Sequence, residues 1–517
     1  MKNGLFAVAL FCFALQSSPA RAQSNVTWNG GTGNWTVSGN WTPSVVPNNS
    51  GSTVYNAFID GGRSVNSQVL LNSNAAIGDL TLDHGDSLTI QGLPNAPSQL
   101  VAGGNVLING ILNVGVNGSL NLSSQLTVGS GGVLNNSGIF GSSTLLPNLT
   151  VNADGIVNNY GTFGDGMLQI SGTLNNWGDI QHHGVTVNQG GVLNNFGALP
   201  LSDWGGLDVH GVLYNAEGAS IGGVDVALGL TGTGVFLNAG TLTLGNVRVA
   251  FDGTFTNLPT GTVTSLLRAI SFSNGFQNQG ALELGYSGNM HVTGNFLNSG
   301  NVNILSDSAL TVQGSYIQTA GQTTVDTSCC GNPLLSVLGG QIAILGGTLQ
   351  GGGSGLASDS PLAGNVFMNG RLEPSNPSLG LSTGVLMVNG NYTQSNAGIY
   401  TADLGGLLVG AEYDQVQISG QAILNGILKL VVSSNFLPQI GNSFAIMTFG
   451  SSSGMFRSVS WLGLPQGLIF KINYNPNNVT AVVAQSPEPA SLILFSTGMC
   501  VVMGVRRRRQ FRNSRSH

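Results

Sequence analysis

The chain has 517 residues, of which 79 are glycine, 41% are hydrophobic and only 7% carry a charge. An average soluble protein has about 25% charged residues and about 7% glycine. So little charge combined with many β-branched and aliphatic residues excludes an intrinsically disordered chain. The length accommodates several domains or one elongated domain.

The charged residues are unevenly distributed. Residues 23–485 contain seven basic and twenty acidic side chains, a balance of −13. Because such a segment lacks the positive charge that neutralises phosphates, we predict no nucleic-acid partner. Both ends of the chain are basic, which sets them apart from the acidic body.

The N-terminal segment has the three parts of a secretory signal peptide. MKNGLFAVALFCFALQSSPARAQS contains one early lysine, an apolar run and the small residues Ala20 and Ala22. This pattern predicts a signal helix within residues 1–22 and cleavage between Ala22 and Gln23. We therefore expect the Sec translocon as a partner and a mature protein outside the cytoplasm. The alternative is a buried first helix.

The C-terminal segment combines an apolar stretch with a block of arginines. Residues 490–505 carry no charge, and Arg506, Arg507, Arg508 and Arg509 follow directly. This stretch is shorter than the ~20 residues of a comfortable span, but snorkelling arginines and local bilayer thinning accommodate it. We predict one C-terminal transmembrane helix with its arginines in the cytoplasm. The alternative is a buried C-terminal helix with a solvated basic end.

The tripeptide Pro487-Glu488-Pro489 stands just before this apolar stretch. Together, residues 486–512 resemble the PEP-CTERM sorting signal of Gram-negative bacteria. The resemblance implies recognition by an exosortase, which is a membrane protease or transpeptidase. It also implies transient anchoring in the inner membrane and removal of the tail near the tripeptide. The resemblance concerns routing and implies no activity.

Cysteine usage agrees with export but offers no disulfide framework. Cys12 and Cys500 lie in the terminal segments, which leaves only the adjacent pair Cys329 and Cys330 in the body. Adjacent cysteines form a strained vicinal disulfide or remain thiols, and the sequence leaves both states open. Because no further Cys or His cluster follows at ligand spacing, we predict no metal site and no cofactor.

A repeat of about twenty residues dominates the body. Segments such as GGVLNNSG (131–138) and SGTLNNWG (171–178) share a glycine, apolar residues, an asparagine and a closing glycine. Successive anchoring asparagines are 17 to 23 residues apart. They are Asn136, Asn159, Asn176, Asn195, Asn215, Asn238, Asn257, Asn278 and Asn298, and Asn113 and Gln318 extend the series.

This period, with strand-like alternation in LTVGSGGVLNN (126–136), predicts an all-β fold, an elongated parallel β-helix or β-solenoid over residues 101–325. Apolar side chains are expected to stack inside. Asparagines at the corners tolerate a left-handed backbone and can hydrogen-bond to neighbouring coils as a ladder. A leucine-rich repeat is the alternative, but its Leu-x-x-Leu-x-Leu core and its helix-forming residues are missing.

The regions on either side of the repeat differ from it. Residues 23–100 contain Trp28, Trp35 and Trp41, and we predict an N-terminal β cap with the first coils. The alternative is a tryptophan platform on which sugars stack. Residues 335–484 contain VNGNYTQ and EYDQVQISG, which resemble the last passenger region of autotransporter-like proteins. This resemblance implies late coils and a β-sandwich-like junction, and we expect no translocating barrel after it.

Catalytic groups are scarce in the repeat. Glycoside hydrolysis needs two carboxylates facing one cleft, whereas most acids here stand alone in their coil. These acids are Asp154, Asp165, Asp179, Asp203, Asp208, Asp225 and Asp252, and the only basic residues near them are Arg248 and Arg268. A spacing of about twenty residues can stack two acids on one face, but isolated acids more often cap turns.

Two histidine arrangements in the repeat are candidates for a site. The adjacent His182 and His183 point to opposite faces of a strand, so they suit an exposed turn better than a metal site. Asp203, Asp208 and His210 are close in sequence, but no nucleophile elbow accompanies them. We therefore predict no catalytic residue.

The sequence favours an exported, non-enzymatic structural or adhesin-like protein of the cell surface or extracellular matrix of a Gram-negative bacterium. The expected partners are an exosortase, the Sec translocon, and exopolysaccharide or neighbouring surface proteins. The alternative is a β-helical carbohydrate-active enzyme, a polysaccharide lyase or hydrolase, with the same tail. An ice-binding solenoid is a third possibility, but the regular Thr-x-Thr array that it needs is missing.

Overall fold

The computed structural model describes most of the body of the chain. It covers residues 21–59, 62–141, 148–164, 166–181, 184–200, 206–223, 229–245, 249–266, 269–285, 287–305, 307–326, 332–352, 361–374 and 383–487. The predicted signal helix and the predicted C-terminal transmembrane helix lie outside these residues. Within the described residues, no helix is long and apolar enough to cross a membrane.

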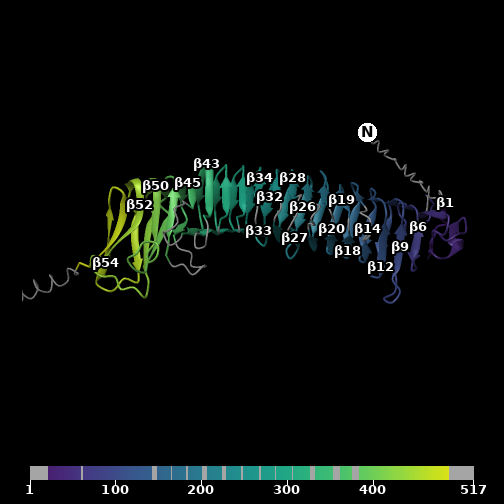
Figure 1. The fold of residues 1–517 in the computed structure, drawn as a ribbon, viewed down its shortest axis with the longest axis horizontal. Coiled ribbons are helices and arrows are strands. Elements are labelled where there is room, and N and C mark those ends of the chain that lie inside the picture. The colour runs from purple at the N-terminus through teal and green to yellow at the C-terminus, as the bar shows by residue number, and fades with distance from the viewer. Residues whose placement is uncertain are drawn as a thin grey trace, which may run out of the picture. The chain divides into compact units, whose positions relative to one another are not determined.

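Two compact units make up the chain, residues 1–274 (unit 1) and 275–517 (unit 2). Both are built from short β-strands, as Figure 1 shows, and the described helical structure is the 3-10 turn η1 (Ser38–Asn40). Strands that occupy the same place in successive coils pair in parallel, so each unit is a parallel β-solenoid. This confirms the predicted all-β solenoid class.

The strands of unit 1 form three stacks, and every complete coil after the first contributes one strand to each. The first stack comprises β1 (Ala22–Trp28), β4 (Thr53–Ile59), β7 (Leu80–Leu82), β10 (Val106–Ile108), β13 (Leu126–Val128), β16 (Leu149–Val151), β19 (Met167–Ile170), β22 (Gly184–Val187), β25 (Leu207–Val209), β28 (Leu230–Gly232), β31 (Val249–Phe251) and β34 (Ala269–Phe272). The second stack comprises β2 (Thr32–Asn34), β5 (Gln68–Leu71), β8 (Ser87–Ile90), β11 (Ile111–Val114), β14 (Val133–Asn136), β17 (Ile156–Asn159), β20 (Thr173–Asn176), β23 (Val192–Asn195), β26 (Val212–Asn215), β29 (Val235–Asn238) and β32 (Thr254–Asn257).

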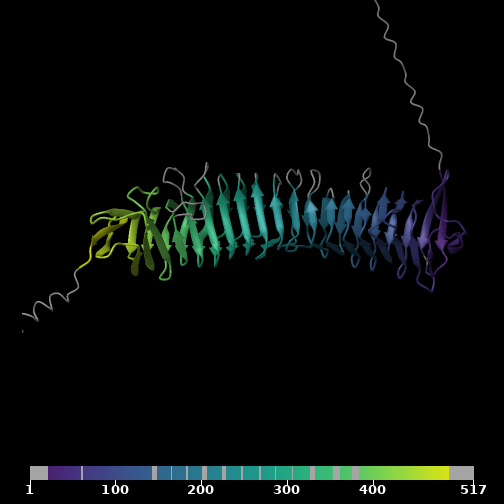
Figure 2. The same ribbon diagram turned by 90° about the horizontal axis from the view of Figure 1, so that it is seen from below.

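The third stack of unit 1 follows a tight corner after the second. It comprises β6 (Ala75–Ile77), β9 (Ser98–Ala102), β12 (Gly118–Leu122), β15 (Ile139–Phe140), β18 (Thr162–Gly164), β21 (Asp179–Gln181), β24 (Ala198–Pro200), β27 (Ser220–Gly223), β30 (Thr241–Leu244) and β33 (Thr262–Leu266). Figure 2 shows successive strands of this unit side by side and pointing the same way.

The register between coils places equivalent residues of the repeat beside each other. In the second stack, Leu134 of β14 pairs with Val157 of β17, which in turn pairs with Leu174 of β20. The side chains of the inward row of this stack are at most 1% exposed. They are Leu112, Leu134, Val157, Leu174, Leu193, Leu213, Phe236 and Phe255. Burying one such side chain stabilises the fold by about 1.5–3 kcal/mol, so these rows form the core of the unit.

The closing glycine of the repeat is required by the corner between the second and third stacks. A Cβ on Gly178 would lie 2.0 Å from the carbonyl oxygen of Gly161, and one on Gly197 would lie 2.2 Å from that of Gly178. Real Cβ atoms do not approach a backbone oxygen so closely, so only glycine allows the coils to stack here. The glycine therefore marks close contact between coils.

The N-terminal end of unit 1 is filled by three tryptophans. Trp28, Trp35 and Trp41 are at most 1% exposed, and their rings pack edge to face with centroids 4.8–5.0 Å apart. The Trp35 indole N–H donates to the Pro47 carbonyl, and β3 (Trp41–Thr42) pairs antiparallel with β1. Because the rings are buried, the alternative of a surface platform for sugars is wrong.

Unit 2 continues the same three-strand plan and then departs from it. Its first stack is β37 (Asn289–Val292), β40 (Ala309–Val312), β43 (Leu334–Ile344), β45 (Leu362–Met368), β47 (Val385–Asn389), β50 (Gln415–Leu424) and β52 (Ser443–Gly454), of which β43, β45, β50 and β52 also extend into the second. The second stack further holds β35 (Phe276–Asn278), β38 (Phe296–Asn298), β41 (Tyr316–Gln318) and β48 (Tyr392–Gln394). The third is β36 (Ala281–Gly285), β39 (Asn301–Leu305), β42 (Gln322–Asp326), β44 (Thr348–Gly351), β46 (Arg371–Glu373), β49 (Ile399–Leu404), β51 (Ile427–Val432) and β53 (Ser458–Leu462).

The last described strands of unit 2 reverse direction. β55 (Asn478–Gln485) runs antiparallel to β52 and to β54 (Leu468–Tyr474). An antiparallel hairpin on the last coil covers backbone N–H and C=O groups that would otherwise form an open strand edge. The described chain then ends two residues later, at Pro487.

Candidate functional site

Buried asparagines run along unit 1 as an inner ladder, which we define as Asn136, Asn159, Asn176, Asn195, Asn215, Asn238 and Asn257. All of them are 0% exposed and end a strand of the second stack. From Asn136 to Asn238, each Nδ2 donates to the Oδ1 of the next member toward the C-terminus, at 2.7–2.8 Å.

The same amides also satisfy backbone carbonyls at the corner. Asn176 Nδ2 donates to the Gly178 carbonyl at 3.2 Å and to the Ala198 carbonyl of the next coil at 3.1 Å. Because a buried carbonyl without a donor costs free energy, the ladder stabilises the corner as well as the contact between coils. The predicted asparagine ladder is confirmed. The left-handed backbone that corner asparagines tolerate is not used by these residues, because they lie in β-strands.

A second row of asparagines lies on the outer side of the same strands, and we call it the amide strip. It consists of Asn113, Asn135, Asn158, Asn175 and Asn194, each half-buried. In this row the hydrogen bonds run toward the N-terminus, opposite to those of the inner ladder, since Asn158 Nδ2 donates to Asn135 Oδ1 at 2.9 Å. The other three links measure 2.8–2.9 Å, and Asn113 donates to Thr89 Oγ1 at 3.3 Å.

Mostly apolar rows flank the amide strip on both sides, interrupted by Thr173 before the strip and by Gly115 and Ser137 after it. Two residues before the strip, Ile111 and Ile156 are 41% and 38% exposed. Two residues after it, Tyr160, Trp177 and Phe196 are 53%, 43% and 38% exposed. Their rings stack nearly parallel, with centroids 4.7 and 5.0 Å apart, so they present ring edges to the solvent.

A polar groove of about 420 Å³ lies at the turns between the first two stacks, near the N-terminal end of unit 1. Its lining comprises Gly62, Arg63, Asn66, Asp83, His84, Asp86, Asn109 and Ser130. Asp86 is 3% exposed and accepts the Ser67 backbone N–H at 2.6 Å, while Arg63 donates to the Asn29 carbonyl at 2.8 Å. These two side chains thus hold turns together, and Asp83 and His84 also line the groove.

A hydrogen-bonded cluster surrounds His210 on the outside of the first stack. Its Nε2 lies 3.1 Å from Asp208 Oδ2 and its Nδ1 lies 3.0 Å from Thr233 Oγ1. Thr231 Oγ1 also donates to Asp208 Oδ1 at 2.9 Å. Both the histidine and the aspartate side chains are 41% exposed, so water reaches this cluster freely.

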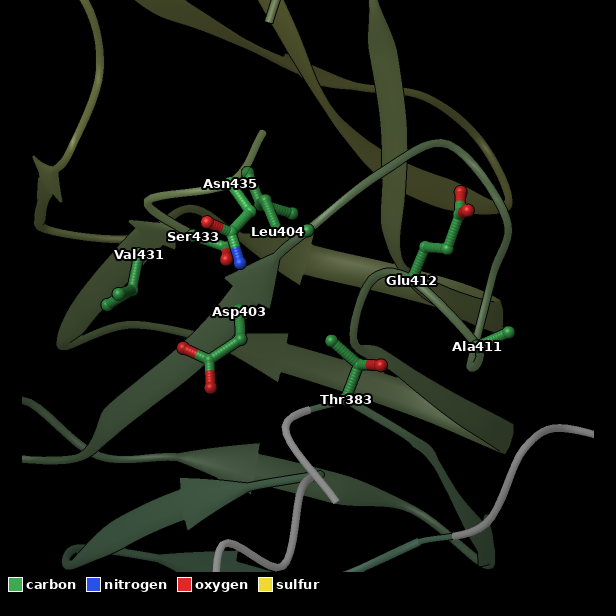
Figure 3. Close-up of a pocket in the computed structure, with 9 residues that line it drawn as sticks. Thr383, Asp403, Leu404, Ala411, Glu412, Val431, Ser433 and Asn435 are labelled. Carbon is green, nitrogen blue, oxygen red and sulfur yellow. The ribbon is translucent and has the colours of Figure 1, made fainter. Parts of the chain in front are cut away.

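A cavity of about 420 Å³ in unit 2 is lined by Asp403, Glu412 and seven neighbours, Thr383, Leu404, Gly405, Ala411, Val431, Ser433 and Asn435. Figure 3 shows the Glu412 carboxylate pointing away from that of Asp403. Glu412 Oε2 instead accepts the backbone N–H groups of Leu407 and Leu408 at 2.7 and 2.9 Å.

Burial raises the pKa of Asp403 to about 6, with a further increase from the charge of Glu373 and a decrease from Lys429. Burial also raises the pKa of Asp414 well above its ordinary value. Asp414 is 1% exposed, and its two oxygens accept the backbone N–H groups of Gly384 and Asp403, both at 2.8 Å. Asp414 therefore ties the backbone just before β47 to β49, and Asp403 lines the cavity.

Most of the candidate processing, cysteine, charged and histidine residues named from the sequence fall outside the described residues. These are Ala20, Glu488, Pro489, Arg506, Arg507, Arg508, Arg509, Cys329, Cys330, His182, His183, Asp165, Asp203, Asp225, Arg248 and Arg268. Ala22 and Gln23 are exposed and belong to β1, where the Ala22 N–H donates to the Ser52 carbonyl at 2.9 Å. Of the described candidates, the structure brings Asp208 and His210 together, and within the described residues no group of three His, Cys, Asp or Glu could hold a metal ion.

Sequence reasoning missed the polar groove and the cavity beside Asp403. The groove residues come from turns of four successive coils and carry no local motif. Their common signal is their place after a first-stack strand, which becomes visible only once the coils are in register. Thr231 and Thr233 were missed for the same reason.

No family model and no curated protein matches the chain. Among solved structures, a fragment of TibA covering its residues 55–350, hyperglycosylated by TibC, is similar over 75% of this chain and 99% of that one. The identity is 12% and the TM-score 0.15, so this likeness carries no argument about the site. The β-solenoid class rests on the strand pairing described above.

Proposed function

We propose that the protein is an exported, non-enzymatic, adhesin-like component of the cell surface or extracellular matrix. The observation that carries this proposal is the amide strip, an outward row of uncharged hydrogen-bonding groups repeated from coil to coil. A surface of this kind suits contact with a long partner rather than turnover of a small substrate. Below the strip, the inner ladder uses the buried amides to hold the coils together.

We further propose that the terminal segments route this body. In this proposal the Sec translocon exports the chain, and the C-terminal segment holds it in the inner membrane. An exosortase then recognises Pro487, Glu488 and Pro489, with the arginines from Arg506 to Arg509 on the cytoplasmic side. The support for this step is the sequence pattern and the resemblance to PEP-CTERM tails.

Mass spectrometry of the mature protein from the envelope and from the medium tests the routing. We expect an N-terminus at Gln23 and a C-terminus at or near the Pro-Glu-Pro tripeptide. A matched variant with Glu488→Ala should accumulate in the membrane with its tail intact. Exported wild-type protein that retains Arg506 to Arg509 would refute the sorting proposal.

The polar groove favours a second candidate function, a β-helical carbohydrate-active enzyme. Arg63, Asp83 and His84 place basic and acidic side chains in one space of about 420 Å³, which lyase or hydrolase chemistry requires. A turnover assay on acidic and neutral polysaccharides decides between the two. If product forms, and if His84→Ala abolishes it while the exposed control Glu217→Gln does not, the enzymatic function replaces the structural one.

A further inference from the structure

The amide strip and its flanking rows form a continuous uncharged surface within an acidic protein. In the second stack of unit 1, the outward positions from Thr32 in β2 to Thr256 in β32 include no charged residue. By contrast, residues 23–485 as a whole carry a balance of −13. A polyanion gains nothing at this surface and is repelled by the surrounding charge, whereas a neutral polymer meets no electrostatic cost.

The strip also leaves regularly spaced hydrogen-bonding capacity. A primary amide has two N–H donors and an oxygen with two lone pairs. The link from Asn158 to Asn135 uses one donor and one lone pair, and the link from Asn175 to Asn158 repeats this. The second donor and the second lone pair of each amide remain for a ligand, once per coil, at intervals of about 4.8 Å.

The flanking rows border the amide strip so that it has the width of one extended polymer chain. The amides are half-buried, whereas Ile156 on one side and Tyr160 and Trp177 on the other are 38–53% exposed. Since Tyr160 and Trp177 stack face to face, their edges form an apolar wall along the strip. A polymer lying between the rows would meet amides below it and apolar groups beside it.

We propose that the amide strip binds a neutral polysaccharide that lies parallel to the solenoid axis, with about one sugar per coil. Sugar hydroxyls both donate and accept, so each matches the paired donor and acceptor that one strip amide leaves. The apolar faces of the sugars contact Ile156 and the aromatic edges. Side-chain contacts of this type bind sugars without any charged group.

This inference rests on the proposed function, because it names the polymer that a surface or matrix protein holds. The two remain separable by experiment. Routing is measured on the mature termini, whereas binding is measured with purified full-length protein. A chain that is exported and processed but retains no polysaccharide affinity therefore contradicts only the present inference.

The test is affinity electrophoresis of the full-length chain in native gels that contain hydroxyethylcellulose, xyloglucan, galactomannan or alginate. A polyoxyethylene detergent keeps the chain in solution without offering sugar headgroups that compete. We expect retardation by at least one of the three neutral polymers and none by alginate. Retardation by alginate alone, or by no polymer, would overturn the proposal.

The double variant Asn158→Leu/Asn175→Leu removes two strip amides. Leu237 already occupies the equivalent position two coils beyond Asn194, so the fold tolerates leucine in this row. The control Thr150→Leu/Gln169→Leu changes a register-matched pair on the first stack of the same region. Losing two hydrogen-bonding amides should weaken binding about tenfold, and the control should bind like the wild type.

Two results contradict the assignment to a polysaccharide. One is equal binding by the strip variant and the control, which places the sugar elsewhere on the molecule. The other is a dimer in light scattering that the strip variant abolishes while wild-type protein ignores every neutral polymer. In that case the strip is a docking surface for a second copy of the chain.

Discussion

The corner after the second stack is built differently in unit 1 and near the end of unit 2. In unit 1 the same residue, a buried asparagine, recurs in every coil from Asn136 to Asn257 and bonds to its own counterpart. In unit 2 the equivalent place in β48 is held by Gln394, whose Nε2 donates to the carbonyls of Gly398 and Ile427 at 2.9 and 3.1 Å. Its Oε1 accepts the Tyr392 hydroxyl at 2.9 Å.

Both arrangements satisfy buried carbonyls, but the amide side chains differ in the residues to which they are hydrogen-bonded. A ladder member such as Asn176 is the acceptor of one neighbour and the donor of the next. Gln394 instead accepts from the fully buried Tyr392 in the same strand and donates to the Ile427 carbonyl of the next coil. The ladder therefore links each inner coil to both of its neighbours through identical side chains, whereas the Gln394 side chain links its coil to one neighbour.

The largest expected effect comes from interrupting the ladder with Asn176→Ala. This substitution removes the Asn176 donor from Asn195 Oδ1 and the Asn176 acceptor from Asn159 Nδ2. It also removes the amide donor from the corner carbonyls of Gly178 and Ala198, although the Gly178 carbonyl keeps the Ala198 backbone N–H. Losing several buried hydrogen bonds at once should lower the free energy of unfolding by about 3 kcal/mol. The matched control is Asn175→Ala, one residue away but half-exposed, which should cost less than about 1 kcal/mol.

Urea unfolding followed by circular dichroism measures both variants. The contradicting outcome is an Asn175→Ala variant that lowers the free energy of unfolding as much as Asn176→Ala does. In that case burial does not distinguish the amide strip from the inner ladder, and the assignment of the inner ladder as the stabilising row is wrong.

A smaller effect is expected from Tyr392→Phe in unit 2. The variant keeps the buried ring but removes the donor of Gln394 Oε1, leaving one buried acceptor unsatisfied. We expect a loss of about 1–2 kcal/mol in the free energy of unfolding. The control is Tyr160→Phe, which removes the hydroxyl of a tyrosine that is 53% exposed, and it should leave the free energy of unfolding unchanged. A neutral Tyr392→Phe would show that the local cluster does not need its hydroxyl.

The smallest effect concerns the dependence of stability on pH in unit 2. The pKa of Asp403 is about 6 in the folded protein and about 4 in an unfolded chain, so the folded state binds more protons between these values. Its contribution is therefore complete below about pH 4 and is lost as the pH rises through about 6. Discounted for partial exposure, it amounts to about 1 kcal/mol.

Asp403→Asn should flatten the decline in urea midpoint between pH 4 and pH 7, and Glu217→Gln, an exposed control in unit 1, should not. Asp414 contributes a shift of the same sign, so the variant removes part of the decline rather than all of it. An unchanged pH profile in Asp403→Asn would contradict the burial of this carboxylate.

The difference between the regions also explains how far the sequence could be interpreted. The ladder was predictable because one asparagine and one glycine recur at nearly constant spacing, and each coil repeats the same local geometry. The Tyr392–Gln394 pair, the cavity beside Asp403 and the polar groove could not be predicted, because their residues occur once. They meet only through the turns and the pairing of coils of unequal length.

The sequence by itself determined the parallel β-solenoid, the period of its coils and the position of its corners, because these follow from alternation and from close contacts that recur in every repeat. It also marked both ends as segments with a routing pattern. Only the tertiary structure decided which asparagine of each pair faces inward, so that Asn176 stabilises the core while Asn175 faces the solvent. The physical reason is the register between coils, which aligns residues about twenty positions apart and turns one row into a buried ladder and the other into the half-buried amide strip.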